Sequence, residues 1–141
     1  MTLLPPYSTS LYRWMAVLWT AGIVVGISLP ASSLSPMSPI LSADKLVHFA
    51  LFFVFGALWM RVLCPPDDVG AQSCLRRGIL RLIVLGGLFA GGSELYQQVI
   101  PIRRMMDPYD AVANGAGLLV GMGLYTALVY RRDRGTGVSD G

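Results

Sequence analysis

The side chains that could do chemistry lie in three short stretches of an otherwise apolar chain of 141 residues. They include carboxylates, amides, lysine, arginine and the one histidine of the chain. Such a set can hold an anion through its cations and move a proton through its histidine and carboxylates. The candidates are Asp44, Lys45 and His48 in the first stretch, Glu94, Gln97 and Gln98 in the second, and Arg103, Arg104, Asp107, Asp110 and Asn114 in the third.

The spacing of these residues predicts which of them share a helix face. Asp44 and His48 are four residues apart, as are Asp110 and Asn114, so each pair lies on one side of a helix. Glu94 precedes Pro101 by seven residues, about 10 Å along a helix, and at such depth an ionisable group is costly and usually faces a partner or a wet cavity. We therefore expect Glu94 to be paired or functional.

Several of these residues also have a purely structural interpretation. Asp107 precedes a proline and would cap a helix, while Asp110 could serve the same first turn. Asp44 could complement a helix dipole. Asn114 lies a full turn inside an apolar helix, where it either bonds a neighbouring helix or takes part in a site. His48 is likewise open between a buried, hydrogen-bonded histidine and a functional one.

The composition excludes a soluble or disordered chain and predicts a membrane protein. Hydrophobic residues make up 54% and charged residues 13%, about half the charge of a soluble domain. Four apolar runs are each long enough to cross a bilayer, and lipid forces such runs to be helices. A cleaved signal peptide is the alternative for the first run, but its long leading region and the missing A-x-A site favour a spanning helix. We predict an all-α membrane protein, a single domain over residues 1–141, with four transmembrane helices at about 12–29, 45–64, 79–100 and 108–130.

The basic residues predict the orientation. Eight of the eleven Lys and Arg residues flank the runs on one side, and three, Lys45, Arg103 and Arg104, flank them on the other. Both termini should therefore be cytoplasmic, which puts the three polar stretches at the extracytoplasmic face of the inner (plasma) membrane. Arg61 and Arg81, near run ends, are interpreted as snorkelling anchors. Because topology explains the basic balance, we expect no nucleic-acid partner.

Two further features limit the architecture and the chemistry. Gly87 and Gly91 are four apart in the third run, as are Gly117 and Gly121 in the fourth, so we expect these two helices to pack closely as a hairpin. A zinc site normally needs more His or Cys than one histidine provides, so we expect no metal and no cofactor. A serine-hydrolase motif and a phosphate-binding glycine loop are also missing.

The two polar blocks resemble those of the VanZ-like family. The DKLVH stretch (Asp44, Lys45, His48) precedes one helix, and the block with Glu94, Gln97, Pro101, Arg, Asp and Asn114 leads into another. The resemblance is strongest over residues 40–125. It implies a small polytopic membrane protein whose polar set falls on Asp44, Lys45, His48, Glu94, Gln97, Arg104, Asp110 and Asn114.

The family arginine has two possible positions. Counting forward from Glu94 and Pro101 gives Arg103, whereas counting back from Asp107 and Asp110 gives Arg104. We favour Arg104, because the Arg-x-x-Asp-x-x-Asp order is then kept into the last helix.

Two functions of different classes are consistent with the sequence. In the first, the polar residues form an extracytoplasmic pocket that binds or acts on an envelope lipid or its anionic headgroup. His48, Glu94 and Asp110 would be the proton-handling residues, and Asp44, Lys45, Gln97, Arg104, Asp107 and Asn114 would bind the ligand. In the second, the chain is a non-catalytic structural or assembly subunit of a cell-envelope complex, and the same residues form a network that joins the helix ends. Whether the protein is an enzyme is left open by the residues.

Overall fold

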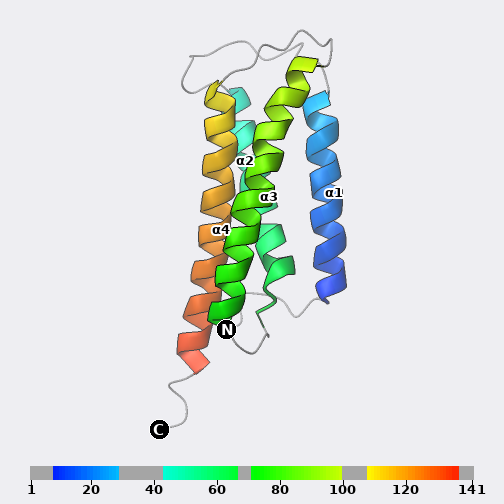
Figure 1. Ribbon diagram of the computed structural model, residues 1–141. Helices are drawn as coiled ribbons and strands as arrows, with labels where there is room; N and C mark the ends of the chain where they lie inside the picture. Colours follow the sequence, from blue (N-terminus) through cyan, green and yellow to red (C-terminus); the bar gives the residue numbers. More distant parts are fainter. Residues whose placement is uncertain (1–7, 29–42, 67–70, 100–107, 137–141) are drawn as a thin grey trace.

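The computed structural model describes residues 8–28, 43–66, 71–99 and 108–136, and four α-helices with no strand make up these ranges. The helices are α1 (Thr9–Ser28), α2 (Ala43–Leu63), α3 (Ala71–Val99) and α4 (Pro108–Thr136). They lie side by side as a bundle in which successive helices run in opposite directions (Figure 1). The upper end of the bundle is defined here as the end where α1 and α3 finish and α2 and α4 begin, and the lower end as the opposite one.

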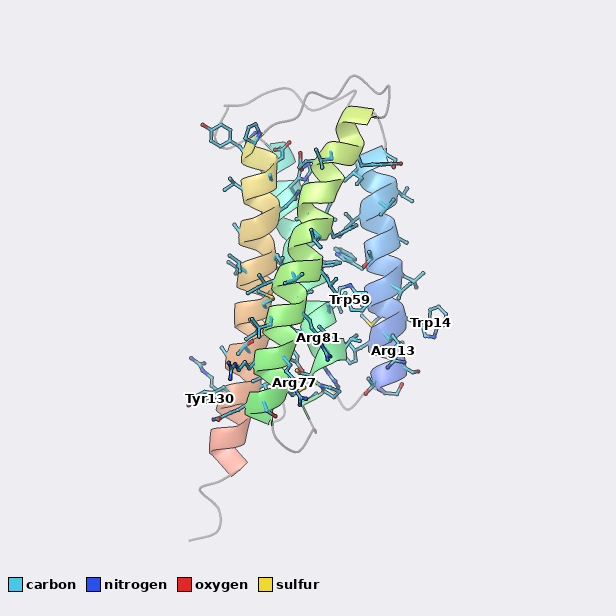
Figure 2. All side chains as sticks on the ribbon, viewed as in Figure 1. Arg13, Trp14, Trp59, Arg77, Arg81 and Tyr130 are labelled. Carbon is cyan, nitrogen blue, oxygen red and sulfur yellow. The ribbon has the colours of Figure 1, made fainter. Side chains whose placement is uncertain are left out.

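Each of the four helices is long and apolar enough to cross a membrane. The spans are Thr9–Ser28, Lys45–Leu63, Gln72–Tyr96 and Pro108–Arg131. Their outward faces carry many exposed apolar side chains, such as Leu18, Leu85 and Leu88. Figure 2 shows Trp14, which is 67% exposed, pointing away from the bundle. Lipid would cover such surfaces, so the prediction of a four-helix, multi-pass membrane protein is confirmed.

The helix bounds differ from the sequence-based ones mainly in α3 and α4. Helix α3 begins at Ala71 rather than near 79. The prediction took only the apolar run, whereas the first turns of the helix carry the exposed polar residues Gln72, Arg76 and Arg77. Helix α4 continues past Tyr130 to Thr136. Helices therefore project beyond the apolar segments at the lower end.

Helices α2 and α3 each pack on all three other helices, and α2 makes the more extensive contacts. Its most extensive contact is with α4, and glycines bring the two backbones together. A Cβ atom on Gly117 would lie 2.2 Å from the carbonyl oxygen of Phe49, and one on Gly121 would lie 2.1 Å from that of Phe53. Only glycine permits this approach, which fixes the register of α4 against α2.

The expected glycine contact between α3 and α4 is therefore not the one that forms. Gly117 and Gly121 face α2, and a Cβ on Gly87 or Gly91 would meet nothing within 4 Å. Helix α3 does pack on α4, where Gly86 faces the Leu118 side chain. It meets α2 through aromatic rings: Phe89 lies 5.3 Å from Phe55, centroid to centroid. Glycines four residues apart show that a helix face can be approached closely, but they do not show which helix approaches it. In α3 the face with Gly87 and Gly91 has no neighbouring helix against it among the described residues.

Helix α1 is the most peripheral helix. Only 17% of its span is buried, against 39% for α4, and over the described residues it packs on α2 and α3 but not on α4. Two indole hydrogen bonds connect it to α2. Trp19 Nε1 donates to the Leu51 carbonyl at 2.9 Å, and Trp59 Nε1 donates to Thr20 Oγ1 at 3.1 Å.

Candidate functional site

Five polar side chains from three helices meet at the upper end of the bundle. Helix α2 supplies Lys45 and His48 from its first turns, α3 supplies Glu94, and α4 supplies Asp110 and Asn114. These five residues are called the polar cluster below. They are separated by up to 69 positions in the chain, so only the antiparallel arrangement of α2, α3 and α4 brings them to one place.

Local sequence explains how the helices present these residues. Helix α4 begins at Pro108, a residue well suited to the first helical position, so Asp110 falls in the first turn and Asn114 one turn deeper. Gly117 packs on Phe49 next to His48, and this contact places Asn114, one turn before Gly117, opposite the imidazole. The glycine contacts between α2 and α4 therefore help to set the geometry of the cluster.

The innermost part of the cluster is a chain of hydrogen bonds. Asn114 Nδ2 donates to Glu94 Oε1 at 3.0 Å, and Asn114 Oδ1 lies 3.0 Å from His48 Nδ1. Asn114 is completely buried, Glu94 is 1% exposed and His48 is 3% exposed. Such burial is tolerated because each group has a polar neighbour.

These hydrogen bonds indicate which nitrogen of the His48 ring donates to Asn114. The Asn114 amide group donates to the Glu94 carboxylate, so its carbonyl oxygen faces the histidine and can only accept. His48 Nδ1 must then donate. The other nitrogen, Nε2, lies 4.0 Å from Asp110 Oδ2, where a proton on Nε2 would form an ion pair. A proton on Nε2 would therefore face the Asp110 carboxylate.

The outer part of the cluster is an ion pair at the rim. Lys45 Nζ lies 3.5 Å from Asp110 Oδ1, and the Lys45 and Asp110 side chains are 12% and 8% exposed. The same ammonium lies 5.8 Å from the centroid of the Tyr109 ring. A cation here is held by a carboxylate and an aromatic face while its position at the helix ends keeps it close to water.

The side chains of the remaining predicted site residues lie outside the described part of the structure. Asp44 lies in the first turn of α2 and Gln97 in the last turn of α3, but their side chains are not among the described ones. Arg103, Arg104 and Asp107 lie outside the described residues. Among the described side chains, no three His, Cys, Asp or Glu residues group in a way that could hold a metal.

One buried charge was not expected from the sequence. Arg61 was interpreted as a snorkelling anchor, yet its side chain is 4% exposed, and its guanidinium lies 4.5 Å from the centroid of the Tyr12 ring. Arg81 is exposed, as an anchor should be, and Figure 2 shows it on α3 in the lower half of the bundle. Both arginines lie near an end of an apolar run, so their positions in the sequence did not show that Arg61 is buried and Arg81 exposed. The face of α2 that carries Arg61 is covered by Tyr12 of α1.

Comparison with known proteins gives one match. A family model described as VanZ/LLP1 matches residues 7–130, which includes all four helices up to Tyr130 and both polar blocks. No curated protein and no solved structure matches the chain. Because the family model covers most of the sequence, this four-helix membrane protein belongs to the VanZ/LLP1 family.

Proposed function

We propose that the polar cluster binds the anionic headgroup of an envelope lipid at the extracytoplasmic face of the inner membrane. The observation that carries the proposal is the Lys45–Asp110–His48 arrangement at the end of a membrane-spanning bundle. A cation at the rim, backed by an aromatic ring, can meet a phosphate or carboxylate at headgroup level. Arg104, expected from the sequence, would add a second cation.

The division of the cluster into two parts supports this role. The buried Glu94–Asn114–His48 chain holds the imidazole in one orientation. Its Nε2 then points to the carboxylate that also pairs with Lys45. A headgroup drawn to Lys45 would therefore arrive beside His48 Nε2. Any reaction on the bound headgroup would use this nitrogen.

The second candidate function is that of a non-catalytic structural or assembly subunit of an envelope complex. The specific observation in its favour is that Glu94, Asn114 and His48 bond to one another and are almost completely buried. A closed network of this kind can hold three helices together without any ligand.

Native mass spectrometry of the purified protein with envelope lipid extract tests the proposal. Wild type should retain a defined lipid or headgroup mass, and Lys45→Gln should lower its occupancy about tenfold, the effect of one lost charge-assisted hydrogen bond. The matched control is Arg77→Gln, which replaces an exposed arginine of α3 near the lower end. This variant should retain the adduct. Comparing Arg104→Ala with Arg103→Ala identifies which of the two arginines contributes.

Melting temperatures measured in parallel separate the two candidate functions. An intact melting temperature with a lost adduct supports headgroup binding. No selective adduct in wild type, together with a sharply lower melting temperature for Lys45→Gln, contradicts binding and supports the structural network.

A reporter fused after Tyr130 should be cytoplasmic and one within 100–107 external. The reverse would move the cluster to the cytoplasmic face.

A further inference from the structure

Arg61 carries a buried positive charge for which the described part of the chain supplies no counter-charge. Its Nε and Nη1 atoms are buried and make no hydrogen bond. The carboxylates whose side chains are described, Glu94 and Asp110, both belong to the polar cluster at the opposite end of the bundle. An arginine cannot discard its proton, so a buried guanidinium needs an anion.

Two features reduce the cost of this burial but leave Nε and Nη1 without a hydrogen-bond acceptor among the described residues. The Tyr12 ring faces the cation at 4.5 Å, and Arg61 lies in the last turn of α2, where the helix dipole favours a positive charge. Neither feature is a hydrogen-bond acceptor for Nε or Nη1. The Tyr125 hydroxyl, which also lines this region and donates to the Cys64 carbonyl, forms no hydrogen bond with Nε or Nη1.

Arg61 lines a hollow of about 220 Å³ between α1, α2 and α4. Helix α1 does not pack on α4 over the described residues, so the hollow lies in the gap between these two helices, with α2 as its floor. Apart from the guanidinium and the two tyrosines, its walls are apolar. The apolar lining residues are Phe53, Val54, Ala57, Leu58, Leu124 and Leu128.

A second apolar hollow of about 590 Å³ borders the first one and runs between α1 and α2. The two hollows share Val54 and Leu58 in their walls. Val54, Leu58 and Arg61 follow one another at helical spacing along a single face of α2, over about 10 Å. Together they form a path with a cation at the lower end and hydrocarbon walls leading toward the middle of the membrane.

The depth of Arg61 matches the headgroup region of a bilayer. It lies two residues before Leu63, where the apolar span of α2 ends, which is about 3 Å along the helix axis. Exposed arginines at the same end, among them Arg77 and Arg81 (Figure 2), add to the positive potential.

We propose that Arg61 binds the phosphate of an anionic phospholipid, one acyl chain of which lies along the two hollows between α1, α2 and α4. The charge of the guanidinium selects an anion, and the apolar walls select a lipid over a free ion. This site is separate from the polar cluster and lies at the end expected to face the cytoplasm. Its lipid is bound as a structural component rather than as a substrate.

The test uses the full-length protein in detergent, with phosphatidylglycerol as the anionic probe and phosphatidylcholine as the neutral one. Wild type should retain one phosphatidylglycerol in native mass spectrometry and show a raised melting temperature with this lipid but not with phosphatidylcholine. Arg61→Gln should lower phosphatidylglycerol retention about tenfold. Arg81→Gln removes an exposed arginine from the same half of the bundle and should lower retention far less than Arg61→Gln does, because solvent screens its charge.

Three outcomes would overturn the proposal. They are equal retention of the two lipids, undiminished phosphatidylglycerol on Arg61→Gln, and equal protection by inorganic phosphate, which would make the site one for a free anion. If Arg61→Gln does not fold, Leu58→Trp decides the matter. It keeps the guanidinium but fills the passage between the two hollows, so it should displace phosphatidylglycerol, and normal retention would contradict the bound acyl chain.

Discussion

The two ends of the bundle handle buried charge in opposite ways. At the upper end, His48 and Glu94 are both bonded to Asn114, so the protein supplies its own polar partners. At the lower end, Arg61 faces the Tyr12 ring and apolar walls, with no described acceptor for Nε or Nη1. The difference indicates that the upper end is organised by bonds between its own side chains, whereas among the described residues the lower end leaves Nε and Nη1 of Arg61 without an acceptor, which is the position proposed above for a lipid phosphate.

Both regions depend on the same helix pair. Helix α2 carries His48 and Arg61, and α4 carries Asn114 and Tyr125, so the contact between α2 and α4 positions polar groups at the two ends. The glycines on the contact lie between the two regions. A change there tests whether they are coupled through one interface.

Gly121→Val should have the largest effect, because it disturbs both ends at once. Its Cβ would lie 2.1 Å from the Phe53 carbonyl oxygen, a backbone atom that cannot move aside without separating α2 from α4. We expect a loss of about 3 kcal/mol in unfolding free energy, the upper range for overpacking. Denaturant titration in micelles measures it. Gly123→Ala is the control, since a Cβ there meets nothing within 4 Å, and equal stability of the two variants would refute the close contact.

Asn114→Leu should have the next largest effect, confined to the upper end. It removes the partner of Glu94 Oε1 and of His48 Nδ1 at a site that is completely buried. The expected loss is about 2 kcal/mol in the same titration. Thr126→Val, which removes only a bond from a threonine hydroxyl to the Met122 carbonyl in the same helix, should cost much less. A similar loss in both variants would mean that the network contributes nothing beyond local helix bonds.

Tyr12→Leu should have the smallest effect and should depend on lipid. Loss of the ring beside Arg61 is expected to cost about 1 kcal/mol in lipid-free detergent. Added phosphatidylglycerol should reduce this loss, because a bound phosphate would then offset the arginine charge. Tyr12→Phe keeps the ring and should match wild type. A loss of equal size in Tyr12→Phe would show that the hydroxyl, and not the aromatic face, is what Arg61 needs.

The fold class followed from the sequence for simple physical reasons. Four apolar runs of bilayer length must be helices, and the long side chains on them must face lipid or one another. The polar residues could also be assigned to one end in advance, because antiparallel helices return Lys45, Glu94 and Asp110 to the same level. Sequence reasoning therefore predicted the components of the polar cluster, although their chemical roles stay predictions.

What the tertiary structure decided is which helix faces meet. The glycine spacing in the third and fourth runs is the same, yet Gly117 and Gly121 pack on α2 while Gly87 and Gly91 face no neighbour. In the same way, Arg61 and Arg81 both lie near run ends, but α1 covers one and leaves the other exposed. Periodicity is a property of one helix, whereas burial and pairing depend on the rotation of two helices about their axes, and that rotation exists only in the folded bundle.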